Sequence, residues 1–165
     1  MSEKTNASRI LERCKIKFDL ISYKVDPEHL DAIHVANELA EDIATVYKTL
    51  VLHGDKNGHF VCVIRGDKEV DLKKAAKISG NKKVAMIPMK ELLPLTGYIR
   101  GGCTAIGMKK NFPVFIDQNA LNQEYIHISA GKRGLQIKLS PKDYIDVTSA
   151  IIGDIISDDS EAFIP

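Results

Sequence analysis

The sequence predicts a single α+β domain in which a mixed, barrel-like β-sheet is surrounded by helices. The chain has 165 residues, 44% hydrophobic and 27% charged, which suits one globular domain with its own core. Strand-like and helix-like segments are interleaved without the steady alternation of a doubly wound parallel sheet. No repeat, low-complexity tract or linker divides the chain. We therefore assign residues 1–156 to one domain and residues 157–165 to an acidic tail.

Two helices and an intervening strand are expected in the first 40 residues. Thr5 or Asn6 can cap the first helix, and residues 18–23 form a strand-like run. Asp26, an N-cap followed by proline in the first turn, predicts a second helix that continues to about Ala40. The inward-facing residues would be Ile10, Leu11 and Cys14 in the first helix, and Leu30, Ile33, Ala36 and Leu39 in the second.

A β-hairpin is predicted at the centre of the chain. Residues 47–52 and 60–64 are rich in strand-forming side chains, and they flank the turn sequence Asp-Lys-Asn-Gly at 55–58. Asp71 then caps a helix that Gly80 ends.

The second half is predicted to alternate again. We expect strands at 83–87, 114–116, 125–128 and 135–139, a short helix at 88–95 with an internal proline, and a final helix that begins at Pro141. The strands at 125–128 and 135–139 would pair across the turn at Gly131–Gly134.

The charges are unevenly distributed along the chain. The net charge is +1, but residues 154–165 carry four acidic and no basic side chains, so residues 1–153 carry +5. Basic pairs occur at 73–74, 82–83, 109–110 and 132–133. They suit weak, salt-sensitive contact with an RNA backbone, or they are ordinary solvated lysines on the surface.

Several classes of protein are disfavoured by composition. The three cysteines are odd in number and widely spaced, and the five histidines lack metal-ligand spacing, so neither a metal nor another cofactor is expected. No apolar run approaches the ~20 residues of a membrane span, and the N-terminus lacks the apolar segment of a signal peptide. A cytoplasmic protein without membrane contact is the expectation.

Lys48 is the most unusual charged residue. If residues 46–52 form a strand, Lys48 shares the apolar face with Val46, Leu50 and Leu52. A lysine there either reaches solvent from the strand end or lies at the mouth of a pocket, where it would hold a carbonyl or phosphate oxygen.

Two glycine-containing loops, at 95–102 and 129–135, suggest a site for an anionic or ester-like ligand. Glycines let a backbone approach a ligand and point its N–H groups at it, although they also serve simple bends and hairpin turns. Cys103 is more readily explained as a small packing residue than as a nucleophile, since no histidine partner is evident. The scarcity of catalytic acids, bases and nucleophiles suits an enzyme that mainly positions its substrate.

Taken in order, five motifs resemble the YbaK/EbsC family, the free-standing relatives of the editing domain inserted in bacterial prolyl-tRNA synthetases. They are Val46-Tyr47-Lys48-Thr49-Leu50, Asp71-Leu72-Lys73-Lys74, Thr96-Gly97-Tyr98 with Gly101-Gly102, Gly107-Met108-Lys109-Lys110, and Ser129-Ala130-Gly131-Lys132-Arg133-Gly134-Leu135. The motifs are specific as an ordered set, and the resemblance runs from about residue 4 to residue 156.

The resemblance implies hydrolysis of mischarged aminoacyl-tRNA in trans, with Cys-tRNA(Pro) as the expected substrate and an ester cleavage assisted by the substrate's own side chain. It implies catalytic roles for Lys48, Gly101 and Gly102 and substrate contacts by Tyr23, Thr49, Ser129, Gly131 and Gln136. Lys109, Lys110, Lys132 and Arg133 would bind the tRNA. Prolyl-tRNA synthetase would be a weakly bound partner that supplies tRNA selectivity.

Two departures from the family pattern leave the substrate open. Cys103-Thr104-Ala105 stands where family members commonly have x-serine-proline, and Gln136 stands where the cysteine-removing branch has an aspartate. A sibling deacylase for alanyl-, seryl- or threonyl-tRNA is therefore an alternative, as is a non-catalytic module that binds RNA or a nucleotide. The oligomeric state is not predicted.

Overall fold

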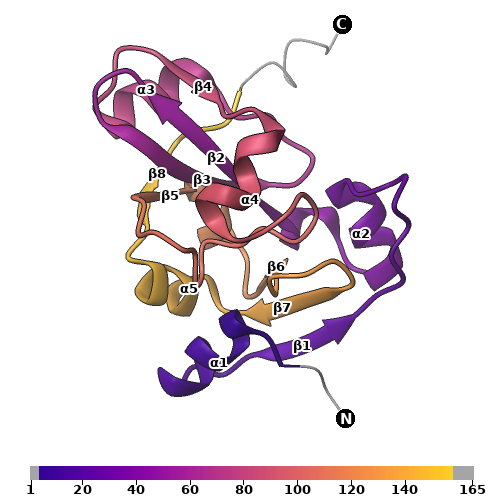
Figure 1. The fold of residues 1–165 in the computed structure, drawn as a ribbon. Helices are drawn as coiled ribbons and strands as arrows, with labels where there is room; N and C mark the ends of the chain where they lie inside the picture. Colours follow the sequence, from indigo (N-terminus) through magenta and orange to yellow (C-terminus); the bar gives the residue numbers. More distant parts are fainter. Residues whose placement is uncertain (1–3, 158–165) are drawn as a thin grey trace, which may run out of the picture.

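The computed structural model describes residues 4–157, which fold into two β-sheets surrounded by helices (Figure 1). The strands are β1 (Asp19–Ser22), β2 (Tyr47–Gly54), β3 (Gly58–Arg65), β4 (Val84–Met86), β5 (Val114–Asp117), β6 (Ile126–Ser129), β7 (Leu135–Leu139) and β8 (Ile151–Gly153). The α-helices are α1 (Asn6–Arg13), α2 (Ala32–Leu39), α3 (Leu72–Ser79), α4 (Leu92–Thr96) and α5 (Pro141–Thr148). Short 3₁₀ turns form η1 (Ile43–Thr45), η2 (Met89–Glu91) and η3 (Gln118–Asn122).

The predicted α+β class is confirmed, but the strands do not close into a barrel. The larger sheet has the order β4-β2-β3-β5-β8, with antiparallel pairs around β2 and parallel pairs on both sides of β5. The smaller sheet, β1-β7-β6, is antiparallel. Only one isolated bridge, from Val46 to His127, joins the two sheets among the described residues. Since the ladder does not continue beyond that bridge, the sheets remain separate.

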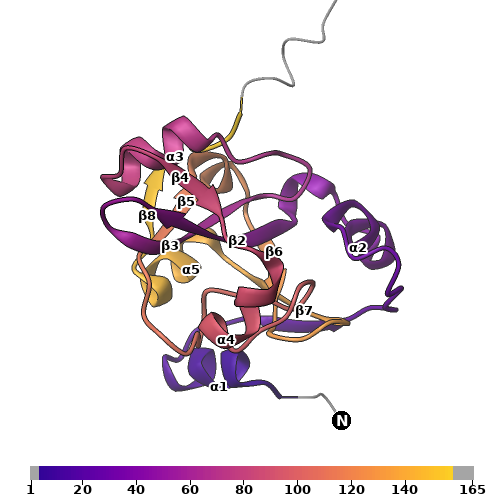
Figure 2. The same ribbon diagram turned by 45° about the horizontal axis from the view of Figure 1, so that its top comes forward.

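The β2–β3 hairpin divides the hydrophobic core into two clusters. Because side chains alternate along a strand, Val51 and Val61 face the larger cluster, which includes the small sheet. Leu52 and Phe60 face the second cluster, which includes Ala75 of α3. In both views α1 and α3 lie at opposite ends of the molecule, so each end of the core has its own helix (Figures 1 and 2).

Local capping explains why several helices begin and end where the sequence predicts. The Thr5 hydroxyl accepts the Ser8 N–H at 3.2 Å, and the Ser8 hydroxyl accepts the Thr5 N–H at 2.9 Å, which closes a reciprocal cap on α1. Asp71 caps α3 through the Lys74 N–H, and Gly80 ends that helix with a φ of 74°.

The second helix begins later than predicted. Asp26 accepts the N–H of Glu28 and closes only a short turn, whereas Asp31 is the N-cap of α2 through the N–H of His34. Ile33, predicted to face inward, is 53% exposed. Cys14, predicted to face inward, is the exposed residue that follows α1.

Strand β8 was not predicted from the sequence. After α5 the chain turns at Ser149, whose φ of 56° is left-handed, and Ile151–Gly153 then pairs in parallel with β5. Apart from Ser157, the predicted acidic tail lies outside the described residues. Among residues 4–157, none of the helices has the length and apolar composition that a bilayer crossing requires.

Candidate active site

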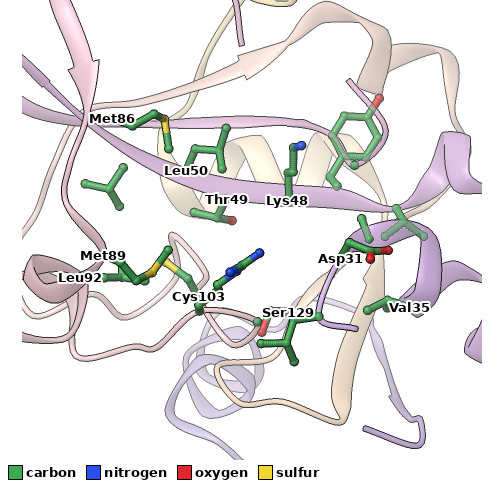
Figure 3. A pocket seen from close by; sticks show the side chains of 18 of the residues that line it. Asp31, Val35, Lys48, Thr49, Leu50, Met86, Met89, Leu92, Cys103 and Ser129 are labelled. Carbon is green, nitrogen blue, oxygen red and sulfur yellow. The ribbon is translucent and has the colours of Figure 1, made fainter. Parts of the chain in front are cut away.

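A cavity of about 310 Å³ lies alongside β2, close to the bridge between the two sheets (Figure 3). Its walls come from the start of α2, from η2 and α4, from the glycine loop at 100–103 and from facing residues of β6 and β7. The apolar part of the lining includes Leu30, Val35, Leu50, Met86, Met89 and Leu92. The polar and charged part is Asp31, Tyr47, Lys48, Thr49, Arg100, Ser129 and Gln136.

Five of the predicted site residues line this one cavity, although they are spread over 89 positions of the sequence. They are Lys48, Thr49, Gly101, Ser129 and Gln136. An apolar cavity with a few convergent polar groups is the usual form of a small-molecule site. The folding of the chain therefore brings together residues that the sequence could only assign to separate motifs.

Lys48 lies on the predicted face of β2. Its register partner in β3 is Ile64, and Leu50 on the same face is paired with Cys62, so the lysine extends the face of the second cluster. Figure 3 shows Lys48 and Leu50 projecting from one side of the strand and Thr49 from the other, toward Cys103 and Ser129. Lys48 is half-buried and forms no ion pair within residues 4–157, which leaves its ammonium group available to a ligand.

The two adjacent glycines of the loop have different roles. Gly101 lines the cavity with a left-handed φ of 84°, and its N–H forms no hydrogen bond within the described part of the chain. The N–H of Gly102 already donates to the Ile99 carbonyl at 2.9 Å, so it is used inside a turn. A Cβ on Gly102 would lie 2.9 Å from the Lys132 Cα, which shows that Gly102 is needed where the two loops touch.

Ser129 and Gln136 form a directly opposed pair across β6 and β7. The Ser129 hydroxyl oxygen accepts the Gly131 N–H at 3.1 Å, so Gly131 fixes the serine although it does not itself line the cavity. Gln136 is 5% exposed, and its amide oxygen has no hydrogen-bond partner within residues 4–157. A buried amide oxygen without a partner is costly unless a ligand or water satisfies it.

The remaining predicted residues lie outside the cavity lining. The main chain of Tyr23 donates to the Gly134 carbonyl, so Tyr23 lies beside the turn between β6 and β7. Arg133 donates from its Nε to the Arg100 carbonyl at 2.8 Å, and Lys132 packs its backbone against Gly102. These two cations therefore adjoin the glycine loop.

The other predicted pair of cations lies elsewhere. Lys109 packs beside Gly97, and Lys110 lines a separate hollow together with Ile10, Phe112 and Val147. The four cations predicted to bind tRNA therefore form two groups, and only the group at 132–133 touches the loop of the cavity.

Sequence reasoning missed Arg100 and Asp31. Arg100 is exposed yet lines the cavity, as does Asp31, whose carboxylate caps α2. In the sequence Arg100 stands directly before the glycine pair, but only the fold shows that it lines the cavity.

Cys103 is a packing residue of the larger cluster, as the sequence suggested, even though it also contributes to the cavity wall. Burial raises the pKa of its thiol to about 12, so the sulfur is protonated at neutral pH and is a poor nucleophile. No histidine lines the cavity among the described residues.

The comparisons with known proteins identify the class of protein to which this fold and cavity belong. The chain belongs to the aminoacyl-tRNA editing domain family, whose model matches residues 26–147. Members of this family act on mischarged aminoacyl-tRNA.

The relatives are similar over most of their length. The chain is 45% identical over 153 residues, 93% of each chain, to a protein of Enterococcus faecalis named "Putative Cys-tRNA(Pro)/Cys-tRNA(Cys) deacylase EbsC". It is 26% identical over 108 residues, 66% of this chain and 68% of the relative, to the uncharacterized protein YwhH of Bacillus subtilis. A crystal structure of "a putative trans-editing enzyme for prolyl tRNA synthetase" shares the fold, with a TM-score of 0.78 and 21% identity over 94% of this chain and 99% of that one.

Proposed function

We propose that the chain removes cysteine from mischarged proline tRNA in trans, with the cysteinyl thiol of the substrate as the nucleophile. The observation that carries this proposal is the content of the cavity. It combines a cation, a free backbone N–H and hydrogen-bonding side chains, but its own thiol, at Cys103, is held in the protonated form by burial. Such a site can hold and polarise an ester but needs the nucleophile from elsewhere.

The reaction can be written with the substrate's own atoms. The thiolate sulfur of the cysteinyl group bonds to the ester carbonyl carbon and forms a tetrahedral oxyanion. The bond from that carbon to the ribose oxygen then breaks, and the ribose oxygen leaves as an alkoxide that takes up a proton from water to become the free tRNA hydroxyl. Water opens the resulting four-membered thiolactone and yields free cysteine. A free thiol with a pKa near 8.5 supplies a few per cent of thiolate at neutral pH.

Lys48 and Gly101 are the residues that we assign to the developing oxyanion. The ammonium group and the N–H group stabilise charge that is larger in the transition state than in the ester. Gly102 does not contribute a donor in this scheme, because its N–H is bonded to Ile99. We assign Gly102 instead to the packing that holds Gly101 in place.

Ser129, Gln136 and Thr49 are assigned to holding the aminoacyl group. Because Ser129 already accepts the Gly131 N–H, its own hydroxyl proton is left for the substrate. The Gln136 oxygen can accept a hydrogen bond from the substrate's α-ammonium group, and as an amide it takes no part in acid–base chemistry.

This chemistry would distinguish a cysteinyl from a prolyl group, which a pocket that reads size alone does poorly. A pocket that recognises one methylene gains only about 1–3 kcal/mol, which is about 10- to 200-fold. The prolyl group has no thiol, so the ester of correctly charged Pro-tRNA(Pro) would not be cleaved in the same cavity. Thr104, the bulkier residue of the altered loop, is fully buried and does not line the cavity, so it does not obstruct a cysteinyl group.

The test is deacylation of proline tRNA charged separately with cysteine, alanine, serine or proline. We expect fast loss of cysteine and a fall in kcat/KM of roughly 10²- to 10³-fold in Lys48→Ala, the loss typical of removing one oxyanion donor. Lys77→Ala, an exposed lysine of α3, is the matched control and should keep full activity.

Each other outcome has a defined meaning. A folded Lys48→Ala variant with unchanged rate would refute the assigned role of Lys48. Preference for alanine or serine would make the protein a sibling deacylase. No hydrolysis, with the tRNA still bound, would favour a non-catalytic RNA-binding module.

We propose that proline-tRNA selectivity comes partly from a weak ternary complex with prolyl-tRNA synthetase, because so small a domain can contact few bases. Pull-down of the synthetase in the presence of proline tRNA should detect this complex at low salt. Absence of the synthetase with and without the tRNA would contradict it.

A further inference from the structure

Arg100 stands at the mouth of the cavity with its charged group unused. It is exposed to solvent and also lines the cavity, which places it where the cavity opens. Its guanidinium group forms no hydrogen bond, ion pair or ring contact with any of residues 4–157. Asp31, the acidic residue of the lining, is occupied as the N-cap of α2 through the His34 N–H at 2.8 Å.

A second arginine, Arg133, is hydrogen-bonded to the main chain of this loop. The Nε of Arg133 donates to the Arg100 carbonyl at 2.8 Å, and its side chain lies 3.3 Å from the position that a Cβ on Gly101 would occupy. Arg133 is also outside any ion pair within the described residues. Arg133 belongs to the turn between β6 and β7, so two neighbouring loops each bring an arginine without a carboxylate partner to this side of the cavity, an arrangement that favours an anionic ligand.

The substrate carries a suitable anion at a suitable place. If Lys48 and Gly101 hold the ester carbonyl inside the cavity, the next charged group outward on the same nucleotide is the phosphate on the 5′ oxygen of its ribose. Arg100 directly precedes Gly101, so the loop that reaches the carbonyl also carries an arginine that lines the cavity and is exposed to solvent. A guanidinium matches phosphate oxygens in a bidentate geometry that a solvated lysine does not offer.

We propose that Arg100, braced by Arg133, binds the 5′ phosphate of the terminal nucleotide of the aminoacyl-tRNA. This inference rests on the proposed function for the position of the ester. It adds a phosphate subsite at the mouth, separate from the groups that act on the carbonyl. Arg100 contributes to binding and orientation, and Arg133 positions the loop.

Two minimal substrates isolate the subsite. One is the cysteinyl ester of adenosine, which lacks the phosphate, and the other is the cysteinyl ester of adenosine 5′-monophosphate. For Arg100→Gln we expect kcat/KM to fall roughly tenfold on the phosphate-bearing ester, mainly through KM, and to change less than about twofold on the other. On the phosphate-bearing ester, kcat/KM of Arg100→Lys, which keeps the charge, should lie between the values of the wild type and of Arg100→Gln.

The control is Arg9→Gln, which removes an exposed arginine of α1 outside both hollows and should leave both substrates unaffected. Substitutions at position 100 leave its main-chain carbonyl in place, so this carbonyl can still accept the hydrogen bond from Arg133. With aminoacyl-tRNA, Arg100→Gln should also lower the salt dependence of binding by about one phosphate contact. Equal losses on the two esters, or no loss on either, would overturn the proposal.

A binding measurement separates this inference from the proposed function. If the wild type does not deacylate Cys-tRNA(Pro), the deacylase proposal fails, but the subsite is still tested by titration with adenosine 5′-monophosphate and adenosine. Tighter binding of the monophosphate that disappears in Arg100→Gln would support the subsite. Equal affinity for the two ligands, or a preference that survives the substitution, would refute it.

Discussion

The contact between Gly102 and the turn at Lys132–Arg133 leads to a sharp test of how the site is held together. In Gly102→Ala the new Cβ would lie 2.9 Å from the Lys132 Cα and 3.1 Å from both the Lys132 carbonyl carbon and the Arg133 nitrogen. All three are backbone atoms, so no side chain can rotate away. The two loops must separate by several tenths of an ångström, and Gly101 moves with them.

The expected cost follows from that geometry. Overpacking of this kind typically destabilises a protein by about 1–3 kcal/mol. For a chain of this size each kcal/mol lowers Tm by roughly 2–4 °C, so we expect a decrease of about 2–12 °C. Displacement of the Gly101 N–H should lower kcat/KM by roughly 10- to 100-fold, because catalysis is sensitive to shifts of that order.

Gly58→Ala is the matched control. Gly58 has a left-handed φ of 72°, but no atom lies within 4 Å of the added Cβ, and the residue is in the hairpin turn far along β2 from the site. It should lose about 1 kcal/mol from backbone strain alone and keep its activity.

The assays are thermal denaturation and deacylation of Cys-tRNA(Pro) for both variants. A Gly102→Ala protein whose Tm and kcat/KM match the wild type, or that loses no more activity than Gly58→Ala, would show that the loops are not held by this contact.

Four further predictions concern polar groups and thiols. Gln136→Met removes an amide oxygen that lacks a partner among the described residues, so we expect Tm to rise by a few degrees while kcat/KM falls, measured by thermal denaturation beside deacylation kinetics. Cys14 is exposed, whereas burial raises the pKa of Cys62 and Cys103 to about 12, so a thiol reagent should modify one thiol quickly and two only after denaturation. The same shifts imply that the free energy of unfolding falls as the pH rises from about 9 toward 12, because the unfolded chain releases those protons first. Burial lowers the pKa of His127 below 6.5 despite the nearby carboxylate of Glu41, so stability should fall as the pH drops below that value, and His127→Gln should weaken the dependence in chemical denaturation.

Elements whose ends are set by local chemistry were predictable from the sequence. The cap at Thr5, the cap at Asp71 and the glycine at Gly80 act on residues within a few positions of themselves, and Asn57-Gly58 closes its own hairpin. The start of α2 was predicted wrongly because Asp26 and Asp31 are both good caps; in the structure Asp26 closes a short turn and Asp31 caps the helix.

Strand β8 and the open sheet depend on partners far away in the sequence. Ile151–Gly153 is a strand only because it lies beside β5, and no periodicity can be read from three residues. A barrel would require β2 to continue its pairing with β6 beyond the bridge from Val46 to His127, and a local sequence pattern does not encode pairing between segments so far apart in the chain.

The residues of the site also differ in whether a local sequence pattern reveals them. Lys48 was found because alternation places a charge on an apolar face, a signal contained in seven consecutive residues. Arg100 was missed because its exposure is ordinary for an arginine, and its importance arises only from the cavity beside it.

The glycine pair shows how one motif can conceal two different physical requirements. Gly101 is required by conformation, since its φ of 84° is unfavourable for other residues, and its N–H remains available to the cavity. Gly102 is required by space, since a backbone 30 residues further along the chain occupies the place of its side chain. The sequence motif suggested two equivalent oxyanion donors, but the two positions act in series: contact at Gly102 sets the loop, and the loop sets the donor at Gly101. A substitution at Gly102 should therefore be rescued by any change that moves the turn at Lys132–Arg133 outward, whereas no such change should rescue a side chain at Gly101.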